Sequence, residues 1–577
     1  MKLSHLVLPL VVALLGSQLM ACSDDDSTPN ARELSTPLQP EAYPSAYPSA
    51  YPYQEGDDIP ATAYIAHDEI YNPESVIPPQ CYTKTNGTNN PCYACHQSYD
   101  RSENRPNQMG DGTLQGNYEF SDVGLTNSWK NLFVDRRQLI KDISDDEILA
   151  YIQEDNYTPA ISDNGNSEHL LPAVMQLEDL SYPQRAFGEH GIANDGSGWV
   201  AYNYKPFPST FWPTNGSTGD AMIRLPERFQ QRNGKYVEDV YLANLTLLEM
   251  TMKDIESLPV PALNEQLIGA DINGDGQLTH NVQTMQRRAS YVGDASATKL
   301  SYLLYPQGTE LLHTVRYIGV DDDGTIYNAP RMKEVRYMQK ALFRSKESLA
   351  SAYYAEAKDK AFEKLPQTRY LNEETGIDNG FGWTLNAFIE DANGELRPQH
   401  PQELAFCNGC HKTVGSTFDQ TFSFARKVPG ASGWGYINLH DMEDVPNINE
   451  QEGEFLTYMK RVGGGDEFRQ NAEMLARWFK SDGSVDESRV KQAASVYELI
   501  TPSPQRALAL NKAYQTIVKE QSYLFGRDAT ITEAHNVLEV IDAEQPPLLP
   551  EHQHAWDMRL DWFAAPVHTV AQQSSGN

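Results

Sequence analysis

The alternation of apolar and polar positions predicts a chain that mixes helices with short strands. Apolar residues recur at spacings of three and four in several long stretches, which favours helices. Other stretches are shorter and are bounded by glycine, asparagine and aspartate, which favours strands. The expected helices lie at about 128–154, 238–257, 331–364 and, as several helices, 467–563, with a short one beginning at Pro401. The expected strands lie at 299–304 and 311–320.

The N-terminus has a pattern of its own. Lys2 precedes an apolar run from Leu6 to Leu15, and small residues follow as far as Ala21, so residues 1–21 are expected to be an export signal. The run is too short to span a bilayer as a retained helix. Residues 22–60 are rich in proline and poor in apolar side chains, which predicts an extended, disordered tether without a core.

The end of this signal carries a second motif. Leu19-Met20-Ala21-Cys22 resembles the lipobox of bacterial lipoproteins. The resemblance implies that Cys22 becomes the lipidated first residue, and several acyl chains on one cysteine give durable anchoring. Ser23 after the cysteine implies the outer membrane rather than the inner one. The alternative is an ordinary cleaved signal in which the cysteine is a coincidence.

The composition limits the classes of partner. The 577 residues include 46 Lys and Arg against 79 Asp and Glu, a formal net charge of −33. Such a charge repels nucleic acid and anionic lipid surfaces, and it favours a basic partner or a cation. The hydrophobic share of 40% is enough for a packed core.

Two copies of a Cys-x-x-Cys-His motif are the main chemical feature, Cys92-Tyr93-Ala94-Cys95-His96 and Cys407-Asn408-Gly409-Cys410-His411. This motif is the attachment signature of c-type haem. The two thiols lie on one turn, so each can add to one vinyl group of the same porphyrin, and the histidine that follows can bind the iron. The alternative is zinc or a thiol redox pair, but zinc would need two more ligands around each pair.

The paired motifs make the chain similar to dihaem c-type cytochromes. The resemblance covers the two pentapeptides, and it implies two covalently bound haem c groups with His96 and His411 as proximal iron ligands. The implied thioether anchors are Cys92, Cys95, Cys407 and Cys410. We therefore expect an α+β fold in which mainly helical, cytochrome c-like haem regions at 61–180 and 341–577 flank a mixed α/β middle segment at 181–340.

The sixth ligand of each iron decides between an electron carrier and an enzyme. The histidine and methionine candidates are His67, Met109, His169, Met175 and His190 for the first motif, and His440, Met442, Met459 and Met474 for the second. No spacing rule selects among them. Because these residues are numerous enough to close both sites, we expect two six-coordinate irons.

A further motif suggests a calcium ion. Asp271-Ile272-Asn273-Gly274-Asp275-Gly276 matches the first half of an EF-hand loop, with oxygen ligands from Asp271, Asn273 and Asp275 and the backbone carbonyl of Gln277. Val282 stands where a bidentate glutamate belongs, so a hydrogen-bonded turn is the alternative. For the weaker version at 321–324 we expect a hairpin turn.

Cys81 is the cysteine that remains after the two motifs and Cys22 are assigned. It is either a buried, inert thiol or a thiolate near the first haem that binds iron or substrate. Dihaem cytochromes that oxidise sulfur compounds are similar in general plan and use cysteine ligation.

Together these features predict a lipid-anchored dihaem cytochrome in the envelope of a Gram-negative bacterium. It would transfer electrons in the periplasm or at the outer membrane, with other cytochromes or an outer-membrane electron conduit as partners and no nucleic acid. One alternative is a dihaem oxidoreductase, peroxidase-like or acting on a small sulfur substrate, with one open or thiolate-ligated haem. Another is an assembly or surface-binding lipoprotein.

Overall fold

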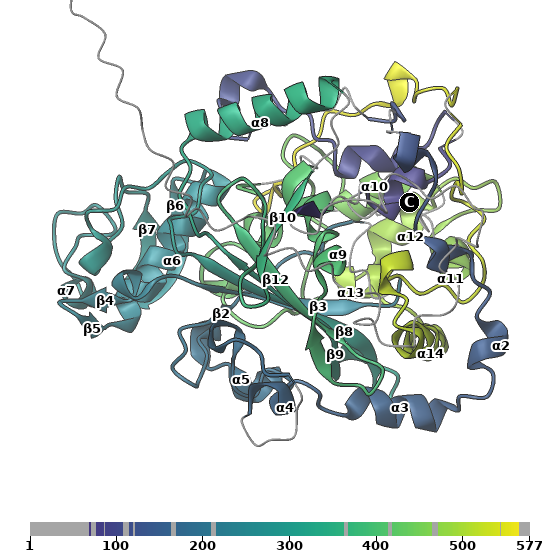
Figure 1. Cartoon of the computed structure of the whole chain (residues 1–577). Coiled ribbons are helices and arrows are strands. Elements are labelled where there is room, and N and C mark those ends of the chain that lie inside the picture. The colour runs from purple at the N-terminus through teal and green to yellow at the C-terminus, as the bar shows by residue number, and fades with distance from the viewer. Residues whose placement is uncertain are drawn as a thin grey trace, which may run out of the picture. The chain divides into compact units, whose positions relative to one another are not determined.

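An antiparallel sheet organises the fold (Figure 1). The computed structural model describes residues 69–70, 77–85, 87–107, 115–118, 120, 122–162, 169–208, 215–362, 367–413, 418–463, 471–542 and 544–564. Among these residues, nine strands form the sheet in the order β1-β10-β11-β12-β9-β8-β3-β2, and β13 pairs with β12. The strands are β1 (Glu69–Ile70), β2 (Val200–Ala201), β3 (Thr218–Arg224), β8 (Glu310–Val320), β9 (Ile326–Gln339), β10 (Thr368–Asn372), β11 (Gly376–Asp378), β12 (Thr384–Glu390) and β13 (Leu396–Pro398). Two small ribbons pair β4 (Gln231–Arg232) with β5 (Lys235–Tyr236) and β6 (Ser257–Leu263) with β7 (Val282–Gln286).

Strands from all three of the expected regions share this sheet. β1 lies in the expected N-terminal region, and it pairs with β10 from the C-terminal region. β9 ends the expected middle segment, and it pairs with β12 from beyond that boundary. The region that follows residue 341, which we expected to be mainly helical, therefore contributes four strands, β10 to β13.

The hairpin of β8 and β9 is the longest pairing in the sheet. The strand expected at 311–320 and the hairpin turn expected at 321–324 are both confirmed, since Asp321 N–H donates to the Thr325 carbonyl at 2.9 Å and Gly324 N–H to the Asp321 carbonyl at 2.9 Å. The helix expected from Arg331 is wrong in its first part, because residues 331–339 belong to β9. Backbone pairing with β8 and β12 on both sides outweighs the helix propensity of this segment.

The helices lie around the sheet. They are α2 (Arg137–Ile140), α3 (Asp145–Gln153), α4 (Thr158–Ile161), α5 (Pro183–Ala186), α6 (Glu238–Lys253), α7 (Glu265–Ile268), α8 (Lys346–Ala361), α9 (Pro401–Leu404), α10 (Glu454–Val462), α11 (Ala472–Trp478), α12 (Glu487–Gln492), α13 (Val496–Ile500) and α14 (Pro504–Glu520). The helix expected at 238–257 is confirmed as α6, which ends where Asp254 adopts a left-handed conformation with a φ of 58°. The short helix expected from Pro401 is confirmed as α9. The strand expected at 299–304 is wrong: the segment makes only isolated bridges and turns at Leu303, whose φ is 54°.

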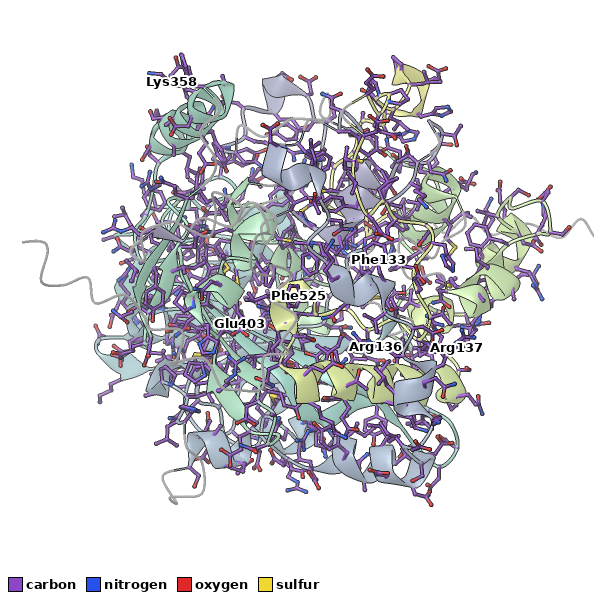
Figure 2. The ribbon with its side chains drawn as sticks, turned by 45° about the vertical axis from the view of Figure 1, so that its right-hand side comes forward. Phe133, Arg136, Arg137, Lys358, Glu403 and Phe525 are labelled. Carbon is purple, nitrogen blue, oxygen red and sulfur yellow. The ribbon has the colours of Figure 1, made fainter. Side chains whose placement is uncertain are left out.

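The helix expected at 128–154 is interrupted. Only α2 and α3 form, and the Ser144 hydroxyl accepts a hydrogen bond from Glu147 N–H at 3.1 Å, which caps a new helix start. Before α2, the buried Arg136 (labelled in Figure 2) reaches α14, where its guanidinium donates to the Thr516 hydroxyl at 2.8 Å. This polar contact fixes the segment against α14.

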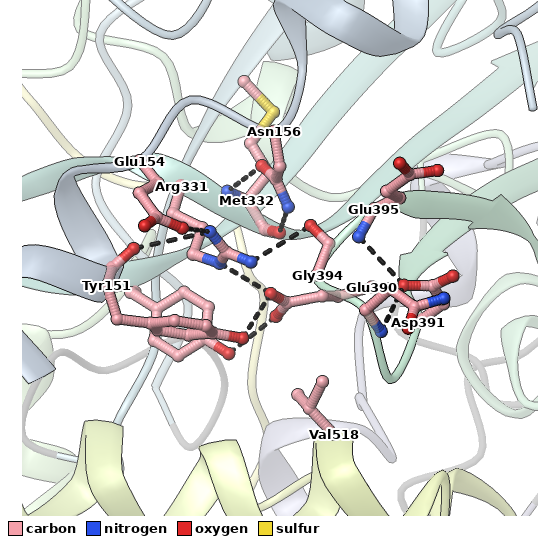
Figure 3. A network of polar contacts seen from close by, with 12 residues as sticks. Tyr151, Glu154, Asn156, Arg331, Met332, Glu390, Asp391, Gly394, Glu395 and Val518 are labelled. Carbon is pink, nitrogen blue, oxygen red and sulfur yellow. Dashed lines mark hydrogen bonds and ion pairs between the residues drawn. The ribbon is translucent and has the colours of Figure 1, made fainter. Parts of the chain in front are cut away.

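A buried ion pair ties α3 to the sheet (Figure 3). Arg331 Nε donates to Glu390 Oε1 at 2.6 Å, and the hydroxyls of Tyr151 and Tyr317 donate to the same carboxylate at 2.5 and 2.6 Å. Glu154 pairs with the other end of the guanidinium at 2.9 Å. These contacts join α3, β8, β9 and β12 in one network that satisfies the buried charges.

The first and last parts of the described chain cover each other. Thr83 forms a bridge with Val537, and Ser98 forms one with Trp556. Side chains from the two parts also share a small core that contains Tyr82 and Trp129 from the first part and Val537 from the last. The segment that carries the first CxxCH motif is therefore held by residues near the C-terminus.

Candidate functional site

A cavity of about 320 Å³ lies between the central sheet and both CxxCH motifs. Cys95 from the first motif and Cys407, Cys410 and His411 from the second contribute to its lining. Its volume is in the range that small-molecule and cofactor sites occupy. The structure thus brings together two motifs that are separated by more than half of the chain.

The sheet forms the floor of this cavity through β3, β8, β9 and β12. Ala221, His313, Arg336 and Ala387 are consecutive partners across these four strands, so their side chains lie in one row on one face. The side chains at the two ends of this row are small, and the two in the middle are large. Ala221 leaves space above the sheet, and the larger side chains of His313 and Arg336 also line the cavity.

Aromatic side chains build the walls. Trp129, from the segment after the first motif, packs against Phe406, which directly precedes Cys407, with ring centroids 5.0 Å apart. Phe422 packs its ring against the edge of His411 at 5.3 Å between centroids. These three aromatic side chains all line the cavity. Its walls therefore suit a planar, apolar group.

The second motif begins directly after α9. Glu403 on this helix accepts a hydrogen bond from His400 N–H at 2.7 Å and pairs with Arg397 through both carboxylate oxygens at 2.8 Å each (Glu403 is labelled in Figure 2). This buried network fixes the helix that presents the motif. Burial raises the pKa of the Cys407 thiol and raises that of Cys410 to about 11, so both stay protonated at neutral pH.

His411 has the orientation of a metal-binding histidine. Its Nδ1 lies 2.7 Å from the Gln420 carbonyl oxygen, which can only accept a hydrogen bond. The proton is therefore on Nδ1, and Nε2 carries the lone pair that could bind iron. Burial, together with the positive charge of Arg336, lowers the pKa of His411 to about 4, so the imidazole is neutral at neutral pH.

The first motif forms a tight turn. The side-chain oxygen of Asn90 accepts from Tyr93 N–H at 3.2 Å, and the N–H groups of Cys95 and His96 both donate to the Cys92 carbonyl, at 3.0 and 2.8 Å. Burial raises the pKa of the Cys92 thiol to about 11. The local geometry places both thiols and the histidine on one turn, as the sequence predicts.

Cys81 lies near both motifs. Burial raises the pKa of its thiol, and negative charge on Cys92 or Cys410 would raise this pKa further. Pro78, Pro79 and Gln80, which precede it, line the cavity. The thiol is therefore protonated at neutral pH, which disfavours a free thiolate.

One wall of the cavity carries an excess of positive charge. Glu334 accepts from Arg336 at 2.9 and 3.0 Å and from Arg527 at 2.8 Å, so two guanidinium groups share one carboxylate. The Nε of Arg527 and the hydroxyl of Tyr514, both buried, have no hydrogen-bond partner in the part of the chain that the structure describes. Donors of this kind suit a carboxylate-bearing ligand. Together with the apolar walls, they fit a haem with its propionate groups.

The sequence missed the residues that the sheet adds to this site. His313, Met338, Arg336 and Glu334 all lie in the middle segment, which we had assigned away from the haems. Beside the first motif, Gln115 donates to the carbonyls of both His96 and His554, at 2.9 and 2.7 Å, so the structure also brings His554 there. These residues could not be assigned to the site from the sequence, because they lie far from both motifs along the chain.

The predicted sixth ligands that the structure describes lie elsewhere. Met175, Met442, Met459 and Met474 are buried in the hydrophobic clusters, and none of them is among the residues that line the cavity. His440 stacks on Tyr497 at 3.7 Å between centroids and lines a separate pocket of about 190 Å³. His190 lies beside Glu189 and Glu238, and His169 does not line the cavity either. His67 and Met109 are outside the described residues.

The comparisons with known proteins concern the whole chain. Residues 65–497 match a protein family described as lipoproteins. The chain belongs to this lipoprotein family. A relative from Aquifex aeolicus (strain VF5), described as an uncharacterized lipoprotein, is 32% identical over 538 residues, which cover 82% of this chain and 89% of the relative. No solved structure matches the chain.

Membership in this family makes the protein a lipid-anchored lipoprotein of the cell envelope. The predicted lipid attachment site, Cys22, lies outside the described residues, as do the export signal and the tether. Of the helices that the structure describes in this lipoprotein, none is both long enough and apolar enough to cross a membrane.

The predicted calcium loop of the lipoprotein folds as a compact turn. Asp271 accepts from the N–H groups of Gly274 and Gly276 at 2.7 and 2.8 Å, and Asp275 accepts from Gln277 N–H at 2.8 Å. Asn273 donates to the Asp275 carboxylate at 3.0 Å. Within the described ranges, the lipoprotein gathers no group of three or more His, Cys, Asp or Glu side chains that could hold a metal ion. Calcium binding stays a prediction, and the turn needs no ion to satisfy its hydrogen bonds.

Proposed function

We propose that this lipoprotein is a dihaem c-type cytochrome that transfers electrons between redox proteins in the periplasm or at the outer membrane. The observation that supports this most is the shared cavity: thiols from both CxxCH motifs line it, and one wall presents donors that suit propionates. Haem c, when bound, supplies a reversible one-electron couple at its iron.

The chain's own residues would have separate tasks. Cys92 and Cys95 would anchor one haem, and Cys407 and Cys410 the other, with His96 and His411 as the proximal ligands. The Gln420 carbonyl would hold the His411 ring in the tautomer that binds iron. The apolar walls would keep water from the site, which limits rearrangement when the charge changes.

The partner should be a protein with a basic surface. The net charge of −33 favours encounter with such a protein through long-range attraction. Reduction of a basic c-type cytochrome by the reduced lipoprotein should therefore slow as ionic strength rises. A rate that does not depend on salt would argue against a basic partner.

The number of attached haems tests the proposal. Protein made with a c-type maturation system should gain the mass of two haems, and acid–acetone extraction should leave them attached. Replacing Cys407 and Cys410 by alanine should leave one haem, as should the matched pair Cys92 and Cys95. Cys81→Ser is the control and should keep two. A wild-type protein without covalent haem would refute the proposal.

The position of Cys81 supports a second candidate, a haem oxidoreductase with an open iron or with an iron whose binding would deprotonate the Cys81 thiol. Its thiol lies near a cysteine of each motif, where a substrate or an iron could meet it. Rapid carbon monoxide binding by the reduced protein, together with peroxide turnover, would select this candidate. A thiolate-type spectrum that Cys81→Ser abolishes would select the sulfur-chemistry version.

A further inference from the structure

We infer that His313, on β8, is the distal iron ligand of the haem that the second CxxCH motif holds. This inference rests on the proposed function, since it requires a haem at Cys407 and Cys410. It names a ligand from the sheet that lies about 100 residues before the motif in the chain, and both His313 and the motif line the same cavity.

The hydrogen bonding of His313 fixes its tautomer. Nδ1 lies 2.6 Å from the backbone carbonyl oxygen of Asp220 on the neighbouring strand. A carbonyl oxygen only accepts, so Nδ1 carries the proton and Nε2 carries the lone pair. A ring whose Nδ1–H donates to a carbonyl is the usual arrangement of a histidine that binds metal through Nε2.

The residues around Asp220 make this orientation rigid. The Asp220 carboxylate accepts from Thr314 Oγ1 at 2.7 Å, from Arg316 Nε at 3.0 Å and from the Tyr436 hydroxyl at 2.6 Å. Asp220, Thr314 and Arg316 are all buried. The carbonyl that holds the imidazole therefore belongs to a strand position that is fixed from several sides.

The floor of the cavity leaves room for the ring. A Cβ atom at Gly219 would clash with the Thr314 carbonyl oxygen and would lie 3.1 Å from His313 Cε1, so the close strand approach requires glycine beside the ring. The cross-strand partner of His313 on this side is Ala221, which is also small. A glycine and an alanine therefore flank the imidazole where larger residues would crowd it.

His313 and His411 form a matched pair in one cavity. Both line it, and both donate Nδ1–H to a backbone carbonyl, so each presents a lone pair on Nε2. Arg336 is the cross-strand partner of His313, and its positive charge also acts on His411. One histidine belongs to the attachment motif and the other to the sheet, so the two together could hold one iron if a haem is bound in this cavity.

Met338 is the competing ligand within the cavity. It lies on the same face of the sheet, one row away from His313, because it pairs with Leu311. Its thioether could bind iron, but no hydrogen bond from the described residues directs it, and the side chain packs in the largest hydrophobic cluster. The orientation of His313 by Asp220 is the difference that favours the histidine.

The test compares spectra of holoprotein variants in which the haem count is also measured. In His313→Ala, one of two haems should become high-spin and bind carbon monoxide rapidly when reduced, and added imidazole should restore the low-spin spectrum. His313→Met should give the spectrum of a histidine–thioether haem. His440→Ala is the matched control and should leave both haems as in the wild type, and Met338→Leu tests the competing ligand and should leave both irons low-spin.

The outcomes separate the two claims. Two haems with an unchanged low-spin spectrum in His313→Ala would overturn this inference and leave the proposed function standing. The same follows if Met338→Leu, rather than His313→Ala, opens an iron. Absence of haem from the wild type would refute the proposed function itself. The wild type also provides a test that needs no substitution. Its near-infrared charge-transfer bands should include a component from a bis-imidazole haem. Absence of that component would overturn the inference.

Discussion

The carboxylate of Glu334 balances the cationic wall of the cavity. Burial alone would raise the pKa of this carboxyl, but the charges of Arg336 and Arg527 and hydrogen bonds from Arg336 and Gln399 outweigh burial and lower the pKa from 4.5 to about 2. One pKa unit corresponds to about 1.4 kcal/mol, so ionised Glu334 contributes about 3 kcal/mol to the free energy of unfolding. Because the folded state has the lower pKa, this contribution is complete above pH 4.5 and is lost as the pH falls towards about 2.

Glu334→Gln tests this reasoning, because it keeps the shape of the side chain and removes its charge. At neutral pH we expect the variant to be less stable than the wild type by about 3 kcal/mol, since the largely buried Arg527 and the partly exposed Arg336 lose their shared counter-charge. As Glu334 of the wild type becomes protonated, the difference should shrink between pH 4.5 and about 2.

The assay is urea denaturation of both proteins across this pH range, followed by far-ultraviolet circular dichroism. Glu374→Gln is the matched control, because it removes an exposed carboxylate from the turn between β10 and β11. The control should follow the wild type at every pH. A constant difference between Glu334→Gln and the wild type would show that the ionisation of Glu334 does not carry the effect.

Three further predictions concern other parts of the molecule. Arg331→Met should lower the free energy of unfolding by about 3–5 kcal/mol, measured by urea denaturation, because it leaves the buried Glu390 carboxylate without its cation. Adding Glu390→Gln should recover part of this loss. If stability does not recover, the pairing is contradicted. Cys22→Ala should release the protein from membranes in fractionation without changing the haem spectrum, whereas continued membrane association would indicate another anchor. Joint replacement of Asp271 and Asp275 by alanine should abolish any calcium-dependent rise in melting temperature, and an equal response in both proteins would assign the loop to the turn alone.

The sequence predicted local features better than it predicted the site. The periodicity that marks α6 and the turn between β8 and β9 depend on residues close in the chain, and both were predicted correctly. The segment from Arg331 to Gln339 was predicted wrongly as helix, because its charged residues are typical of an exposed helix. In the fold, Glu334 instead accepts hydrogen bonds from Arg336 and Arg527, a long-range arrangement that the sequence does not indicate.

The same limit applies to the cavity. The two CxxCH motifs could be read directly, since each is a complete local unit. His313 could not be selected from the sequence, because its relevance depends on the register that sets it between Ala221 and Arg336. A single histidine in a strand gives no signal until the pairing of three strands is known.

The contact between the two ends of the chain has a consequence for biogenesis. Asn90, two residues before Cys92, donates a hydrogen bond to the carbonyl of His552, 462 residues later. An exported chain crosses the inner membrane from its N-terminus, so the first CxxCH motif reaches the periplasm long before the residues that cover it. Under the proposed function, the thiols of the first motif would be accessible to the haem-attachment machinery for longer during translocation than those of the second motif. Attachment order would follow from the topology of the chain, with the first motif loaded ahead of the second.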